Sequence, residues 1–382
     1  MRDLSQTLRG KYINVDTIRR TVDSGPYDAV IVVSPENVPY YSGFYNMDLR
    51  TLPERFHFAI WPRDGEPAFV VVERRAQTLR PEETYITDLR GYEGEGLDSM
   101  RVVAEVLQQH GVISGRVGIE GRNFPGGHLQ ELQRRLPDVN FDDAYYFLES
   151  VRLIKTPAEI ETLVKVNKMT TAAIDAAWKA ATPGETERDI MARMQFELMK
   201  RGADMVTAPL LAAGERSGMW HATAADLPVE NGMVLKTDFG GTLDGYYSDI
   251  ARTAVMGKAS ARQKELHAKL TEIKDRVIHG IQPGMPASTI ARIGIDAYKA
   301  LGLDFKWSII GHSIGLGLHE SPQIYPWVDE PVQPGMAMMI EIGYNDYPND
   351  SFHVEDLIQI TDNSAEYLTD PTAHATIWEL GV

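Results

Sequence analysis

The sequence has no cysteine among its 382 residues, so it can form neither a disulfide nor a thiolate metal site. Positive charge is also scarce, because 38 Lys and Arg stand against 54 Asp and Glu. The formal net charge of -16 would repel a phosphate backbone, so we expect no nucleic-acid partner. Any metal ion must be held by oxygen and imidazole ligands.

Long apolar runs are missing as well. No segment approaches the roughly 20 apolar residues that span a bilayer, and the N-terminal segment MRDLSQTLRGKY lacks the apolar stretch of a secretory signal. We therefore expect a cytoplasmic protein with no membrane partner. The hydrophobic fraction of 43% and the charged fraction of 24% are ordinary for globular proteins. At about 150 residues per domain, the length suggests two domains.

Residues 1–150 alternate strand and helix signals. Short apolar runs, typical of buried strands, occur at YDAVIVV, HFAIWP, AFVVVE and RVGIEG. Helical patterns lie at residues 100–109, followed by Gly111, and at HLQELQRRL. This alternation predicts a smaller α/β domain over residues 1–150.

A domain boundary is indicated at VRLIKTPAEIETL. Thr156 can cap a helix, Pro157 suits its first turn, and Glu159 completes a capping box. Residues 151–382 then combine four helical segments with four β-rich segments, which predicts an α+β domain. The helices are expected at residues 157–181, 185–201, 261–279 and 287–301, and the strands within GMVLKTDFGG, GYYSDIARTAVMG, GMAMMIEIGY and HVEDLIQIT. The two pairs of helices are compatible with an internal duplication, although no sequence repeat establishes one.

Four carboxylates are predicted to lie on these strands. Asp238 follows apolar strand positions, where an ionised side chain needs a partner or a cation. Asp249 comes eleven residues later, after the turn-rich GGTLDG, so the two can face each other across a hairpin. Glu341 and Glu355 repeat the arrangement around NDYPND. Such a cluster repels itself strongly unless cations neutralise it, and two divalent ions would do so and create a hydrolytic site.

His312 lies in GHSIGLGLHESP, where three glycines permit close approach of the backbone. Strand alternation would place His319 on the opposite face, but the glycines favour a bend. Each residue also has a simpler interpretation: a single acidic side chain at a strand end often serves in a turn or an ion pair, and a histidine beside glycine is often structural. We interpret His353 as structural and assign no function to the histidines on or beside helices.

Taken together, these segments resemble the pita-bread metallopeptidases of family M24, which include prolidase, aminopeptidase P and methionine aminopeptidase, with creatinase as a metal-free relative. SPENVPYYSGF resembles the start of the creatinase-type N-terminal domain, and VRLIKTPAEIETL the junction helix that opens the catalytic domain. The four active-site segments of the family resemble, in family order, DFGGTLDGYYSDIART, GHSIGLGLHESP, PGMAMMIEIGY and HVEDLIQIT. The resemblance covers nearly the whole chain and implies a pita-bread catalytic domain behind a creatinase-like domain.

The resemblance implies a role for each of these residues. Asp238 would be a bidentate ligand of one metal ion, Asp249 and Glu355 would bridge two ions, and His312 and Glu341 would be terminal ligands of the second. His221, seventeen residues before Asp238, and His319 match the two further catalytic histidines of the family.

The implied reaction is hydrolysis by a water that bridges two divalent ions, with Glu341 as proton acceptor and donor and with His221 and His319 bonding the oxyanion or the amide. The donor types suit Mn, Co, Fe or Zn. The substrate would be a small peptide or small amide, and the resemblance implies a homodimer.

Three positions depart from the family pattern. Gln323 and His353 stand where an Arg is usual, and Ile342 replaces a Pro. A neutral Gln323 cannot give the charge-assisted fork by which Arg holds a dipeptide carboxylate. Three functions are therefore considered: first a Xaa-Pro dipeptidase or aminopeptidase, then a relative redirected to a small non-peptide substrate, as in ectoine hydrolases, creatinase or dimethylsulfoniopropionate lyases, and third a catalytically inactive binding module.

Overall fold

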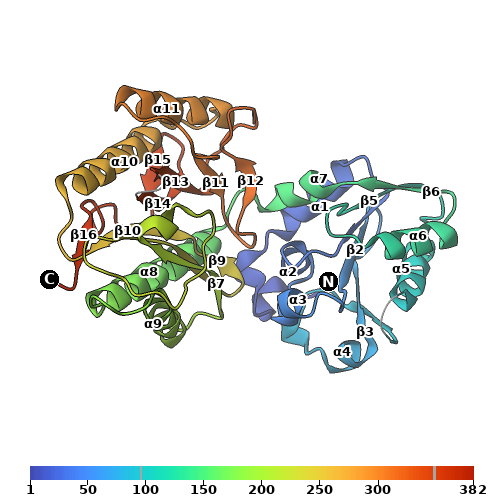
Figure 1. Ribbon diagram of the computed structural model, residues 1–382. Helices are drawn as coiled ribbons and strands as arrows, with labels where there is room; N and C mark the ends of the chain where they lie inside the picture. Colours follow the sequence, from blue (N-terminus) through green and yellow to red (C-terminus); the bar gives the residue numbers. More distant parts are fainter. Residues whose placement is uncertain (95–96, 347–349) are drawn as a thin grey trace. The chain divides into compact units, whose positions relative to one another are not determined.

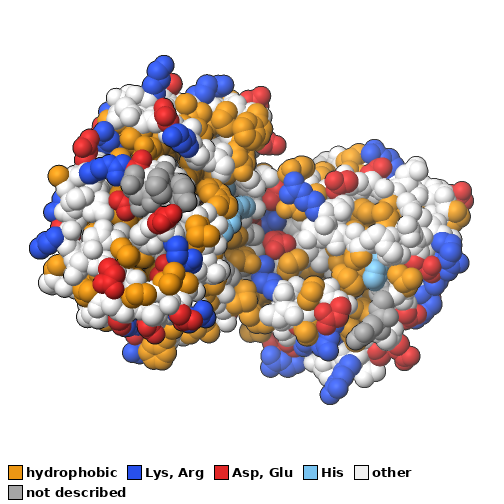
Figure 2. Space-filling view, viewed as in Figure 1, with side chains coloured by type: hydrophobic (Ala, Val, Ile, Leu, Met, Phe, Trp, Pro, Cys, Tyr) orange, Lys and Arg blue, Asp and Glu red, His pale blue; other side chains and the backbone are white. Residues whose placement is uncertain are grey.

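The computed structural model describes residues 1–94, 97–346 and 350–382 (Figure 1). The chain divides into two compact units, Met1–Arg152 and Leu153–Val382. Within the described residues, none of the helices combines the length and the apolarity needed to cross a membrane. On the face drawn in Figure 2, Lys and Arg side chains are interspersed with Asp and Glu.

The first unit is built on a six-stranded mixed sheet with the order β4-β3-β2-β1-β5-β6. The strands are β1 (Ala29–Val32), β2 (Phe58–Pro62), β3 (Ala68–Val72), β4 (Asp88–Tyr92), β5 (Gly115–Ile119) and β6 (Val139–Asp143). Every residue of β1 and β2 is buried, as apolar runs without alternation predict for a sheet covered on both faces. The main helices are α1 (Val15–Ser24), α5 (Asp98–Gln109) and α6 (Gly126–Arg135). The predicted α/β architecture is confirmed.

Four long helices in two pairs frame the second unit. They are α8 (Pro157–Lys179), α9 (Glu187–Lys200), α10 (Ala261–Gly280) and α11 (Ala287–Ala300). The side chain of Thr156 accepts a hydrogen bond from the backbone N–H of Glu159, whose carboxylate accepts from the backbone N–H of Thr156, so the expected capping box opens α8. Figure 1 shows α8 and α9 side by side near β7, and α10 and α11 side by side near β13.

Each pair of helices covers one five-stranded sheet. The first sheet has the order β16-β10-β8-β7, with β9 added to β8, and the second has the order β12-β11-β13-β14-β15. The strands of the first are β7 (Met205–Ala213), β8 (Val234–Leu243), β9 (Tyr246–Tyr247), β10 (Ile250–Met256) and β16 (Trp378–Leu380). Those of the second are β11 (Gly311–Ser313), β12 (Glu320–Gln323), β13 (Ala337–Asn345), β14 (Ser351–Ile360) and β15 (Ala365–Tyr367).

The two halves of this unit repeat the same backbone pattern. After the first helix of each pair, Gly184 N–H donates to Val229 O at 2.9 Å, and Gly284 N–H donates to Val332 O at 2.7 Å. The reciprocal bonds also match. The N–H of Val229 donates to the backbone that links the first pair of helices, and the N–H of Val332 donates to the backbone that links the second pair. The two halves therefore repeat both the hydrogen bonds and the residue types at these positions, which is compatible with the duplication considered from the helix pairs.

The central strands of the two sheets lie against each other. Thr253 on β10 donates its hydroxyl to the carbonyl oxygen of His353 on β14 at 3.0 Å, and the N–H of His353 donates back to that hydroxyl oxygen at 2.9 Å. Beside this contact, Arg252 and Asp356 form a buried ion pair at 2.9 Å. This packing brings the two acidic hairpins of the unit to one place.

Several strands were not expected from the sequence. Strand β7 contains Pro209, and its pairing with β8 shifts register between Thr207 and Leu210, so its pattern is interrupted. Strands β11, β12, β15 and β16 have only three or four residues each, too few for a periodic signal. The turn expected at NDYPND includes residues 347–349, which lie outside the described residues.

Candidate metal centre and active site

The first acidic hairpin is formed by β8 and β10. Asp238 lies on β8, opposite Ala251 in the antiparallel register. Asp249 directly precedes β10, so the expectation that all four acidic residues lie on strands is wrong for this one. The reason is local: Ser248 turns back to β8, where its hydroxyl accepts from the N–H of Gly241 at 2.9 Å. Asp238, Asp249 and Glu355 offer ligand oxygens within 4.8 Å of one another.

The second hairpin places two glutamates face to face. Glu341 on β13 and Glu355 on β14 are direct partners in the antiparallel ladder. Facing residues in such a ladder point to the same side of the sheet, with Cβ atoms about 5 Å apart. Glu355 Oε2 also accepts from the N–H of Ala251 on β10 at 3.0 Å, which ties the second hairpin to the first.

His312 on β11 completes this cluster. Its Nε2 lies 3.6 Å from Asp249 Oδ2 and 3.9 Å from an oxygen of both Glu341 and Glu355. The other ring nitrogen, Nδ1, lies 3.0 Å from the carbonyl oxygen of Ser313, which orients the ring. The structure thus brings together all five residues that the resemblance names as metal ligands.

The chain bends after β11, as the glycines suggested. His319 consequently lies on the same side as His312, with 4.1 Å between the ring centroids. Glu320 braces the bend by accepting from the N–H of Gly317 at 2.8 Å and pairing with buried Lys155 at 2.9 Å. A Cβ at Gly315 would lie 2.7 Å from the Glu320 carboxylate, so this position requires glycine.

The acidic residues strongly perturb one another's protonation. Burial, followed by the charge of Asp249, raises the pKa of Asp238 to about 8. Burial and the neighbouring carboxylates also raise the pKa of Glu355 well above its usual value. Burial alone would also raise the pKa of Glu341. The hydrogen bond and charge of His353, followed by the charge of His312, outweigh burial and lower this pKa to about 2. Carboxylates in this arrangement favour a bound cation, which would offset their repulsion.

The donor atoms fit divalent ions. Asp249 Oδ1 and His312 Nε2 are buried without a hydrogen-bond partner among the described residues, which is costly unless another group engages them. Asp249 belongs both to the group with Asp238 and Glu355 and to a second group with His312 and His319. A set made only of carboxylate oxygens and imidazole nitrogens suits Mn, Co, Fe or Zn.

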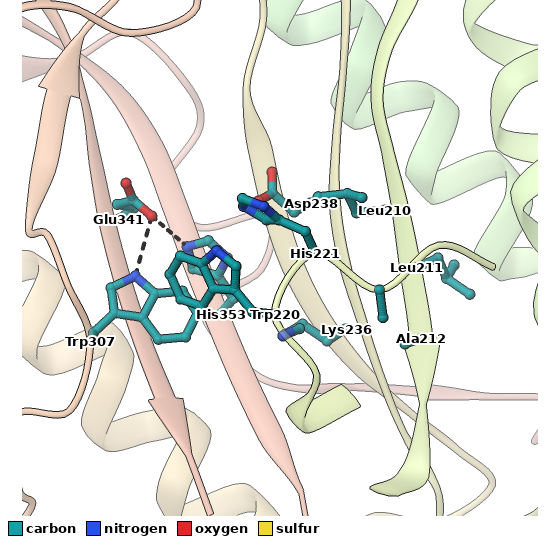
Figure 3. A pocket seen from close by; sticks show the side chains of 11 residues that line it. Leu210, Leu211, Ala212, Trp220, His221, Lys236, Asp238, Trp307, Glu341 and His353 are labelled. Atoms are coloured by element: carbon teal, nitrogen blue, oxygen red, sulfur yellow. Dashed lines mark hydrogen bonds and ion pairs between the residues drawn. The ribbon is translucent and has the colours of Figure 1, made fainter. Parts of the chain in front are cut away.

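A pocket with an empty volume of about 410 Å³ opens beside Asp238 and Glu341 (Figure 3). His221 lines it next to Asp238, as the resemblance implies for a residue that contacts substrate. Its backbone adopts a positive φ of 52°, which is uncommon for a residue other than glycine. His319 is exposed, and burial of part of its ring followed by the charge of His312 lowers its pKa to about 4.

Four further residues of this pocket were not given a functional role from the sequence. They are Trp220, Lys236, Trp307 and His353. His353 was interpreted as structural, yet its Nε2 lies 3.2 Å from Glu341 Oε2, the same oxygen to which Trp307 Nε1 donates at 3.3 Å. Lys236 could have been found, because a residue two positions before Asp238 on a strand shares its face. The tryptophans come from loops and left no such signal.

The comparisons with known proteins agree with this geometry. Residues 15–154 match the model of the creatinase/prolidase N-terminal domain, and residues 161–362 match that of metallopeptidase family M24. A Xaa-Pro dipeptidase of Pyrococcus furiosus is 27% identical over 357 residues, which cover 93% of this chain and 97% of that protein. A Xaa-Pro dipeptidase of Lactobacillus helveticus is 25% identical over 336 residues, 87% of this chain and 89% of that one.

Solved structures show the same fold. A prolidase from Pyrococcus horikoshii superposes with a TM-score of 0.80 at 26% identity, covering 93% of this chain and 97% of that one. An X-Pro aminopeptidase from Thermotoga maritima gives a TM-score of 0.83 at 22% identity, covering 96% of this chain and 100% of that one. Fold and site together define a metal-dependent hydrolase with a creatinase-type N-terminal domain. The chain belongs to metallopeptidase family M24, whose model matches more than half of its length.

Proposed function

We propose that this enzyme is a Xaa-Pro peptidase that uses two divalent metal ions. The observation that carries the proposal is the convergence of Asp238, Asp249, His312, Glu341 and Glu355, with buried donor atoms of Asp249 and His312 left without hydrogen bonds. The substrate class is supported by the relatives named Xaa-Pro dipeptidase that align along nearly the whole chain.

The ligand assignment is the one that the family resemblance implies, and the two groups of donor atoms support it for Asp238, Asp249, His312 and Glu355. Asp238 would bind one ion, and His312 and Glu341 would bind the other. Asp249 would bridge them, which its membership of both groups supports, and Glu355 would be the second bridge. When bound, such ions would supply Lewis acidity toward a carbonyl oxygen and lower the pKa of a nearby water molecule.

The protein side chains would then move the protons. Glu341 would take the proton of the attacking water as the new C–O bond forms, and return it to the amide nitrogen as the C–N bond breaks. His319 lies beside His312, and His221 lines the pocket beside Asp238; both would donate hydrogen bonds to the oxyanion or position the scissile amide. Trp307 and His353 hold one Glu341 oxygen and leave Oε1 on the side of His312.

The test is a substrate panel on the full-length protein, stripped of metal and then supplied with Mn, Co, Zn or Fe. Xaa-Pro dipeptides and longer peptides beginning Xaa-Pro should be cleaved, with non-proline dipeptides as comparison. Glu341→Gln should lower kcat by about 10² to 10⁴, the usual contribution of a general base. Glu366→Gln, an exposed change on β15 of the same sheet, is the matched control and should leave the rate unchanged. Absence of turnover with every peptide and metal would refute the proposal.

A further inference from the structure

One cation in the active-site pocket, Lys236, makes no direct ion pair within the described part of the chain. Lys236 lies on β8, half-buried, and forms no ion pair with any described residue. Its nearest described aromatic contact is Trp307, with the ammonium 5.9 Å from the ring centroid. In Figure 3 its side chain extends along the pocket toward Trp220 and Trp307. The charge of Asp238 acts on this half-buried ammonium without forming an ion pair with it, so the ammonium is free to bind an anionic group.

The position of Lys236 relative to the acidic cluster restricts where that anionic group lies. Lys236 and Asp238 are two residues apart on one strand, so both side chains project from the same face. At about 3.3 Å per residue their Cα atoms are roughly 7 Å apart. This is about two residue steps of an extended chain, so an anionic group held by Lys236 would lie within a short peptide's length of the acidic cluster.

The walls of the pocket suit a compact apolar body. The rings of Trp220 and Trp307 lie 4.9 Å apart by their centroids, and Trp220 is largely exposed at the edge of the pocket. Leu210, Leu211 and Ala212 line the other side. Together these side chains offer an apolar surface between the ammonium of Lys236 and the carboxylates of Asp238 and Glu341.

Building on the proposed function, we infer that Lys236 binds the substrate's free carboxylate on the leaving side of the scissile amide, with an apolar ring against Trp220 and Trp307. The enzyme is then specific for dipeptides and comparable small acids, because a longer peptide has no carboxylate at that place. Lys236 would thus provide the carboxylate recognition for which neutral Gln323 is unsuited.

The test compares Ala-Pro with Ala-Pro-amide at pH 7, on metal-loaded wild-type enzyme and on Lys236→Gln, Lys236→Arg and Lys258→Gln. The wild type should prefer the acid. Lys236→Gln should lower kcat/KM for the acid by about ten-fold or more, chiefly through KM, and that for the amide by much less, because a charge-assisted hydrogen bond is lost. Lys236→Arg should retain the preference, and Lys258→Gln, an exposed control, should behave as wild type. Equal use of acid and amide by the wild type would overturn the inference, whether or not the variants fold.

A binding measurement separates this inference from the proposed function. The quenching of tryptophan fluorescence reports occupancy, because Trp220 and Trp307 line the pocket. L-proline should bind the wild type more tightly than L-prolinamide, and Lys236→Gln should abolish the difference. If this holds while no Xaa-Pro peptide is cleaved, the carboxylate site stands and the peptidase proposal fails. If peptides are cleaved but Lys236→Gln binds both probes as wild type does, the peptidase proposal stands and the carboxylate site fails.

Discussion

His353 places its Nε2 3.2 Å from Oε2 of Glu341, while the other oxygen of Glu341 lies 3.9 Å from His312. The histidine therefore orients a carboxylate that we propose as a metal ligand. Partners of this kind typically change metal affinity by 10- to 100-fold, so His353→Leu should weaken Mn binding by about that factor. Isothermal titration calorimetry measures the effect. Trp307→Phe keeps the ring but removes the second donor and should cause a smaller loss, whereas unchanged affinity in His353→Leu would contradict the orienting role.

Metal removal should lower the stability of the protein, because the acidic cluster then lacks its counter-ions. At a metal concentration 100 times the Kd, binding adds about 2.7 kcal/mol to the free energy of unfolding. Glu355→Gln should change the stability of the metal-bound and the metal-free protein in opposite directions. It removes a carboxyl group whose pKa is raised by burial and then by the neighbouring carboxylates, so the metal-free variant should be more stable than metal-free wild type. Urea titrations with and without Mn test this, and a less stable metal-free variant would refute it.

Lys155 and Glu320 form a buried ion pair at 2.9 Å, with side chains 0% and 1% exposed. Lys155→Met would leave Glu320 buried without its cation, and such changes cost about 3 to 5 kcal/mol of folding free energy. The double variant Lys155→Met with Glu320→Gln should recover part of that loss. The pair of exposed Lys258 with partly buried Glu379 is the control, and Lys258→Met should change the free energy of unfolding little. If Lys155→Met and Lys258→Met lowered the free energy of unfolding equally, burial of the ion pair would not explain the loss.

Burial of His267 on α10, with smaller contributions from Lys274, His374 and Arg252, lowers its pKa to about 4. The unfolded chain has an ordinary pKa near 6.5 and therefore binds the proton first as the pH falls. The contribution of His267 to stability is thus complete above pH 6.5 and is lost by about 1.4 kcal/mol per pH unit between 6.5 and 4. His267→Gln should flatten the pH dependence of the unfolding free energy in this window. His279→Gln, exposed on the same helix, should not.

The fold could be predicted where local signals coincide with the final structure. The capping box at Thr156 and the fully apolar runs of the first sheet are properties of short segments, and both appear as expected. The hairpin of Glu341 and Glu355 was also predicted, because its partners are near in sequence. The metal identity, a homodimer and the cytoplasmic location stay predictions.

The remainder depends on contacts between distant segments. Trp220 and Trp307 meet although they are 87 positions apart, and they come from loops whose paths no periodicity describes. His353 shows the same limitation: its residue type allowed a structural role, and only its distance from Glu341 places it beside the acidic cluster. Lys236 shares a face of β8 with Asp238, but its lack of an ion pair with any described residue became apparent only in the folded chain.

The division of the acidic cluster between the two halves ties its assembly to the order of protein synthesis. Asp238 and Asp249 emerge from the ribosome about a hundred residues before Glu341 and Glu355. Even the sheet that carries the first pair gains its parallel edge strand from Trp378–Leu380. Interrupted translation or proteolytic clipping before Glu355 would therefore yield fragments that lack Glu355. On the proposed ligand set, such fragments should not cleave peptides.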